Sequence, residues 1–257
     1  TSSNAPPPPP PGLSAAQVSM LDSLFAPATA AETTLIASQW KARGVQVDDI
    51  RTEDSSSTSG RDLRVISHVV DGFRHNGIMY APQGEGPFPV LVFAHGGDEG
   101  IDNLQWNLLM QAIGTLRDSI AVLAPSFRSE AVNVTAGFWV SEGRPSPWDR
   151  DVDDLRGLLR ACARTDKRLD TARVSLVGYS RGGGVALLAA QRDPIFKSVA
   201  TIAAPTSFQG PWVRGLAESL LKGDGISLPG VDYIDSAVLR ALDQRRISMD
   251  SARRELI

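Results

Sequence analysis

The chain has 257 residues, of which 26 are basic and 29 acidic, and its formal net charge at pH 7 is −3. This near balance argues against a nucleic-acid-binding surface, and no apolar run is long enough to span a membrane. A single cysteine excludes an internal disulfide, while the length is sufficient for one large hydrophobic core.

The first sixty residues differ from the remainder. Residues 1–12 include an unbroken proline run at 6–11, which favours extended polyproline geometry and predicts a leader or linker. Residues 13–60 are expected to be helical over 13–43, packed on the body of the protein, and to end in a serine-rich loop at 52–60. A start without methionine or an apolar signal core predicts processing, and we expect an exported bacterial enzyme, periplasmic or lipid-anchored.

From residue 61 onward, apolar runs alternate with helical patterns. This alternation predicts one α/β domain over 61–257, with a mainly parallel sheet and helices on both faces. The expected strands are 63–70, 73–80, 89–94, 120–123, 174–177 and 197–204. Residues 207–257 have helical composition and are expected to form a cap-like insertion, with no further strand after it.

An amphipathic helix is expected over residues 149–163. Five apolar side chains recur at helical spacing: Val152, Leu155, Leu158, Leu159 and Cys162. This pattern places the Cys162 thiol in the core and assigns the charged residues to a solvated face, namely Asp151, Asp153, Asp154, Arg156 and Arg160. A solvated face is favoured over a cation site because no histidine accompanies the carboxylates, and no metal or other cofactor is expected.

The best candidate for a catalytic residue is Ser180. The sequence Gly178-Tyr179-Ser180-Arg181-Gly182 follows an apolar strand and opens a helical stretch. A serine on such a tight turn needs small residues at its second neighbours, so that strand and helix pass closely and the hydroxyl points outward. The backbone N–H of Arg181 then lies in the first helical turn, where it favours a developing oxyanion. The alternative is a glycine-rich turn with an ordinary surface serine.

A second oxyanion donor is expected in His95-Gly96-Gly97, directly after the strand at 89–94. Glycines at this place let the backbone turn its N–H groups toward a ligand, and Gly97 is the candidate donor. His95 is expected to brace the loop through hydrogen bonds rather than to act as the general base.

Over residues 62–257 these motifs resemble the α/β-hydrolases of the prolyl oligopeptidase-like and dienelactone hydrolase-like branch. The resemblance also rests on Ala124-Pro125-Ser126-Phe127-Arg128 and on the order Asp151, Asp154, Asp170, Arg173-Val174. It implies the α/β-hydrolase fold and a serine hydrolase acting on ester or peptide bonds through an acyl-enzyme on Ser180. No propeller-length repeat is visible, so the layout is closer to that of esterases.

The resemblance also implies a catalytic acid and histidine after the seventh and eighth strands, yet no histidine follows Ser180. His68 and His75 lie on the first two expected strands, and the second of these is three places from the nucleophile strand, roughly 14 Å away at ~4.8 Å per place. We therefore expect a chain truncated after the sixth strand and the helical insertion. The alternatives are a catalytically silent binding protein, or a fragment that another chain completes.

Aromatic residues flank the expected site. Phe138, Trp139 and Trp148 belong to one loop and Trp212 to the helical insertion, and together they predict an apolar substrate pocket. The expected partner is a small ester or peptide substrate. The sequence does not distinguish the two bonds and gives no oligomeric state.

Overall fold

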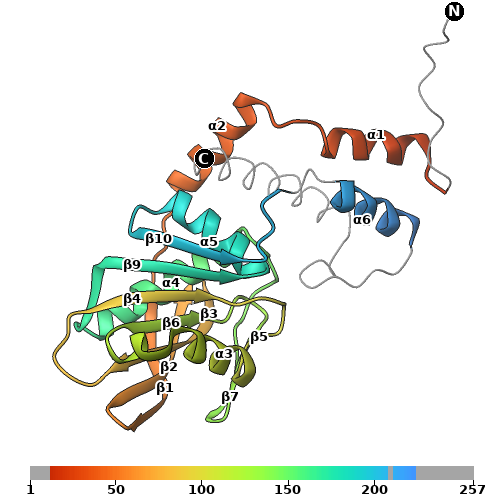
Figure 1. Cartoon of the computed structure of the whole chain (residues 1–257). Helices are drawn as coiled ribbons and strands as arrows, with labels where there is room; N and C mark the ends of the chain where they lie inside the picture. Colours follow the sequence, from red (N-terminus) through yellow and green to blue (C-terminus); the bar gives the residue numbers. More distant parts are fainter. Residues whose placement is uncertain (1–11, 208–210, 224–257) are drawn as a thin grey trace, which may run out of the picture.

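A computed structural model describes residues 12–207 and 211–223. Its centre is a seven-stranded sheet with the order β1-β2-β3-β6-β4-β9-β10 (Figure 1). The strands are β1 Asp48–Thr58, β2 Arg61–Val70, β3 Phe73–Pro82, β4 Phe88–Ala94, β6 Ala121–Pro125, β9 Leu169–Tyr179 and β10 Phe196–Ile202. β6, β4, β9 and β10 run parallel, whereas β1, β2 and β3 are antiparallel to their neighbours. The six expected strands are confirmed, and so is the α/β fold class.

The serine-rich segment is a strand rather than the expected loop. β1 pairs with β2 from Asp48↔Val69 to Thr58↔Arg61 and closes through a tight turn in which Ser59 and Gly60 both have positive φ. This is the geometry that two-residue hairpins favour. The prediction was wrong because β1 is an edge strand whose side chains are mostly exposed, so it lacks the apolar alternation that marks a half-buried strand.

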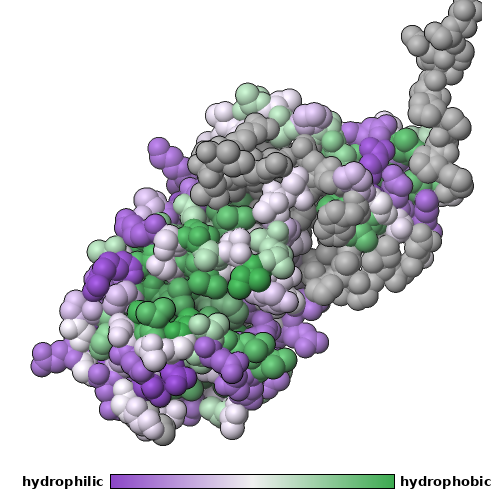
Figure 2. All heavy atoms as spheres, viewed as in Figure 1, coloured by the Kyte–Doolittle hydropathy of each residue, from purple (hydrophilic) through white to green (hydrophobic). Residues whose placement is uncertain are grey.

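The helices lie on both faces of the sheet. α4 Arg150–Thr165 and α5 Arg181–Arg192 pack on one face with α2 Ala30–Ala42, whereas α3 Asn103–Ile113 packs on the other. A short 3₁₀ helix, η1 Gly114–Asp118, follows α3. Figure 2 shows apolar residues gathered on the α3 side of the sheet. On α3, Trp106, Leu109 and Met110 are buried, whereas Leu104 and Leu108 face solvent.

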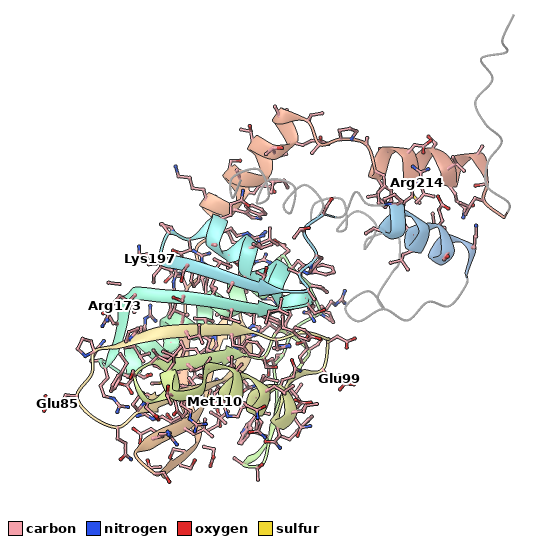
Figure 3. All side chains as sticks on the ribbon, viewed as in Figure 1. Glu85, Glu99, Met110, Arg173, Lys197 and Arg214 are labelled. Carbon is pink, nitrogen blue, oxygen red and sulfur yellow. The ribbon has the colours of Figure 1, made fainter. Side chains whose placement is uncertain are left out.

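The expected N-terminal helices are confirmed as α1 Ala15–Leu24 and α2, and each begins with a capping box. α2 contributes Ile36 and Trp40 to the main core. α1 packs against α6 Pro211–Lys222, where Arg214 pairs with Asp22 at 2.6 Å (Figure 3). None of the helices in the described ranges combines the length and apolar character needed to cross a bilayer.

The solvated face expected on α4 is wrong. Asp151, Asp153 and Asp154 are at most 1% exposed and Arg156 is 9% exposed. Arginines from other parts of the fold neutralise the three carboxylates: Arg181, Arg43 and Arg128 respectively. Such pairing offsets the large cost of burying a lone charge. Across residues 12–207 and 211–223, no group of three or more His, Cys, Asp or Glu residues is placed to hold a metal ion.

Cys162 lies on the inner side of α4, as the apolar spacing predicts. Its side chain is fully buried and forms no disulfide, and burial raises the pKa of the thiol well above its usual range. A thiol that stays protonated is a poor nucleophile, so Cys162 acts as a small core residue.

His68 makes the stability of the fold depend on pH. Its ring projects from β2 against Gly157 of α4, 6.0 Å from the His75 ring, and burial lowers its pKa from 6.5 to about 3, with a further contribution from His75. The unfolded chain therefore takes up a proton near pH 6.5 that the folded protein excludes until near pH 3. The contribution of the neutral His68 to the unfolding free energy is complete above pH 6.5 and is lost as the pH falls from 6.5 toward 3.

We expect His68→Leu to remove this dependence. Urea unfolding of both proteins at pH 7.5 and 4.5 measures it: on acidification, the wild type is expected to lose about 3 kcal/mol more unfolding free energy than the variant. Equal losses in the two proteins would contradict the assignment to His68. The difference between the two pH values cancels any change in packing caused by leucine.

Candidate active site

Ser180 lies on the turn between β9 and α5, at the carboxyl ends of the parallel strands. Its φ of 50° and ψ of −119° are rare for a residue with a side chain. Two backbone hydrogen bonds hold the turn: Ser180 N donates to Ile202 O at 2.8 Å and Gly183 N donates to Ser180 O at 2.9 Å. Arg173 and Lys197, labelled in Figure 3, mark the opposite, amino-terminal side of the same strands.

The glycines of the motif are required by close backbone contacts. A Cβ on Gly178 would lie 2.3 Å from the carbonyl oxygen of Gly182, and a Cβ on Gly182 would lie 2.1 Å from that of Ala94. The first turn of α5 thus passes directly over the end of β4. This approach places the Arg181 N–H, at the positive end of the helix, beside the loop that follows β4.

The loop at 95–97 lies against the nucleophile turn. A Cβ on Gly96 would be 3.2 Å from the Ser180 Cβ, and Gly97 adopts a φ of +73°. The His95 ring is fully buried, and its Nδ1 is 3.0 Å from the Gly96 carbonyl oxygen. Glu99, further along the loop, is exposed at the edge of the molecule (Figure 3).

The Arg181 side chain is 5% exposed and connects the turn to its surroundings. Its Nε and Nη2 donate to Asp151 Oδ2 at 3.0 and 2.8 Å, and its Nη1 donates to the Gly97 carbonyl at 2.9 Å and also to Glu130. Burial alone would lower the pKa of the guanidinium, but Asp151 and Glu130 outweigh burial and raise it. Arg181 is therefore a permanent buried cation next to Ser180.

The sequence did not reveal the roles of this side chain, of Glu130 or of Asp151. These residues come from three distant segments, and the sequence analysis assigned only the backbone of Arg181 to the site. One signal was available: the apolar residues of α4, together with Gly157 and Ala161, occupy so much of the helix that little surface remains for solvated acids.

Phe138, Trp139 and Trp148 do not share one place. Phe138 is 63% exposed on β8 Gly137–Val140, in a small second sheet with β5 Gly100–Asp102 and β7 Ala131–Val134. Trp139 packs partly against the core on the α3 side. Trp148 is 7% exposed and lies in the main core beside Gly184, rather than at an open surface. The side chain of Trp212 is outside the described residues.

No hydrogen bond from any described residue reaches the Ser180 hydroxyl. His75 lies on β3, three places from β9 in the observed order, and His68 is one strand further away. The ring nitrogens of His95 face Gly96 and Glu130. The described residues thus provide a serine on a strained turn and two candidate oxyanion donors, but no general base.

A sheet with a parallel core, and a serine on a strained turn between one of its central strands and the following helix, is the architecture of α/β hydrolases. The chain belongs to the alpha/beta hydrolase family, because the model of that family matches residues 91–254, more than half of the sequence. This membership assigns the protein to the hydrolases as a class.

Comparison with individual proteins adds support for the fold. No curated protein matches the sequence. Among solved structures, an acetyl xylan esterase from Paenibacillus sp. R4 is similar, with 18% identity and a TM-score of 0.51, over 92% of this chain and 78% of that one. Acetyl xylan esterase 1 from Thermoanaerobacterium sp. has 16% identity and a TM-score of 0.49, over 84% and 71%. At these identities the likeness extends to the fold alone.

Proposed function

We propose that the protein is a serine hydrolase that forms an acyl-enzyme on Ser180. The observation that carries the proposal is the strained backbone of Ser180 at the start of α5, directly against the loop Gly96-Gly97. Strain of this kind persists only where the surrounding structure maintains it, and it is concentrated at functional sites. An ordinary surface serine does not need such a conformation.

In the proposed reaction, the Ser180 oxygen attacks the carbonyl carbon of the substrate. The N–H groups of Arg181 and Gly97 donate to the oxyanion that forms, and the positive end of α5 adds to its stabilisation. A general base other than His68, His75 and His95 accepts the serine proton and passes it to the leaving group. Water then releases the acyl group by the same steps in reverse.

We propose esters as the substrate class before peptides. The solved structure from Paenibacillus sp. R4 is named as an acetyl xylan esterase, which makes small acetyl esters suitable first probes. The prolyl oligopeptidase-like and dienelactone hydrolase-like resemblance remains part of this proposal.

Reaction with a fluorophosphonate probe tests the proposal. The protein should be expressed to its natural stop codon, beside the 257-residue chain, and the labelled peptide identified by mass spectrometry. We expect label on Ser180 in the protein read to its stop codon, none in Ser180→Ala, and full labelling in Ser198→Ala, which alters an exposed serine on the neighbouring strand. Absence of label in every form would favour a binding protein with a hydrolase fold.

A further inference from the structure

A buried carboxylate that the proposed reaction does not use lies behind the glycine loop. Glu130, between β6 and β7, is 5% exposed. Its Oε1 pairs with Arg181, and its Oε2 is 3.2 Å from His95 Nε2. Burial alone would raise the pKa of Glu130, but His95 and Arg181 outweigh burial and lower it, so that Glu130 is an anion between two basic side chains.

Each of these two side chains holds one carbonyl of the loop. His95 Nδ1 is 3.0 Å from the Gly96 oxygen, and Arg181 Nη1 donates to the Gly97 oxygen at 2.9 Å. These carbonyls belong to the two peptide planes that meet at the Gly97 Cα. Glu130 therefore contacts both His95 and Arg181, and these two side chains in turn contact the carbonyls of the peptide groups before and after the Gly97 Cα.

The Gly97 N–H takes its direction from this arrangement. It shares a planar trans peptide with the Gly96 carbonyl, and the two groups point in opposite directions. Holding the Gly96 oxygen toward His95 therefore aims the Gly97 N–H away from His95. A glycine at a φ of +73° has wide backbone freedom, so the direction depends on these two contacts and on Gln105, which accepts from Gly96 N at 3.3 Å.

The contacts of His95 require Glu130 in its charged form. Both acceptors that face the ring, a carbonyl and a carboxylate, lack protons to donate. The charged Glu130 lies 3.2 Å from Nε2 and favours the ring orientation in which Nδ1 faces the Gly96 carbonyl. Arg181, by contrast, keeps two hydrogen bonds to Asp151 whether or not Glu130 is present. The contact between His95 and the Gly96 carbonyl is consequently the one that depends most on Glu130.

We propose that Glu130 is a positioning residue for the oxyanion donor: through His95 and Arg181 it holds the two carbonyls that fix the direction of the Gly97 N–H. The proposal rests on the serine hydrolase function proposed above. It assigns to Glu130 an effect on the rate of acyl transfer, separate from its contribution to folding.

The test is Glu130→Gln in the protein expressed to its natural stop codon, with p-nitrophenyl acetate as substrate. Glutamine keeps the size of the side chain and removes its charge. Loss of a whole oxyanion donor costs about 10²–10³ in kcat, so a misaimed donor is expected to lower kcat about 10- to 100-fold. KM should change less than about twofold, because the donor acts on the transition state.

Asp166→Asn is the matched control. Asp166 is another buried acid, 6% exposed, that pairs with Arg168 and Arg64 at the far end of α4. We expect this variant to lower the melting temperature and leave kcat unchanged. The affinity for a trifluoromethyl ketone, which mimics the oxyanion, should fall with kcat in Glu130→Gln only.

Unchanged kcat in Glu130→Gln, or a kcat loss in Asp166→Asn of the same size, would overturn the positioning role. If Glu130→Gln does not fold, His95→Gln breaks the contact between Glu130 and His95 from its other end and must give the kcat loss. A wild-type protein without esterase activity or Ser180 labelling would remove the function and this role together. An active wild type with an unaffected Glu130 variant would remove only the role.

Discussion

Gly182→Ala is expected to abolish the reaction of Ser180 with a fluorophosphonate and to destabilise the fold. The added Cβ would lie 2.1 Å from the Ala94 carbonyl oxygen, 2.4 Å from the Ala94 carbonyl carbon and 2.4 Å from the His95 oxygen. These are backbone atoms of a central strand, so no side-chain rotation relieves the overlap. α5 must move away from β4, which separates Ser180 and the Arg181 N–H from the Gly97 loop.

The expected loss of unfolding free energy is about 4 kcal/mol or more, in the range reserved for severe overpacking. Urea unfolding and probe labelling measure the two effects. Gly215→Ala is the matched control, because Gly215 is also helical, in α6, and its Cβ would meet nothing within 4 Å. There, alanine should stabilise the helix by roughly 1 kcal/mol and preserve labelling. Normal labelling of Gly182→Ala would contradict the observed closeness of helix and strand.

Asp154→Ala is expected to destabilise the protein by about 3–5 kcal/mol, because it leaves the buried Arg128 guanidinium without its partner. Asp154 accepts hydrogen bonds from Arg128 N, Nε and Nη2 at 3.0, 3.1 and 2.6 Å. The two side chains are 0% and 7% exposed. Solvent therefore cannot replace the lost carboxylate.

Two further variants separate the destabilisation caused by the unpaired Arg128 charge from that caused by lost packing. Replacing both partners, as Arg128→Met with Asp154→Leu, should recover most of the stability, since no unpaired charge remains. Asp170→Ala removes an acid from the more exposed pair with Arg173 and should leave the urea midpoint nearly unchanged. If Asp154→Ala shifts the midpoint no further than Asp170→Ala, the buried pair does not have the importance assigned to it.

The nucleophile turn and the glycine loop were predictable because their signals are local. A glycine two places from Ser180 on each side reflects a backbone approach between consecutive elements, and His95-Gly96-Gly97 follows a strongly apolar strand. β1 was missed because an exposed edge strand has no apolar face to reveal it. The acids of α4 were misplaced because their partners, Arg43, Arg128 and Arg181, are distant in the sequence.

By itself, the sequence determined the fold class, the strands from β2 to β10 along the central sheet, and the place of Ser180 at the end of β9. Periodicity and glycine spacing suffice for these, since they express burial and backbone shape within a few residues. Only the tertiary structure decided which charges are buried and which side chains meet behind the glycine loop. Charge pairing depends on segments brought together by folding, and Glu130, His95 and Arg181 become one cluster only there.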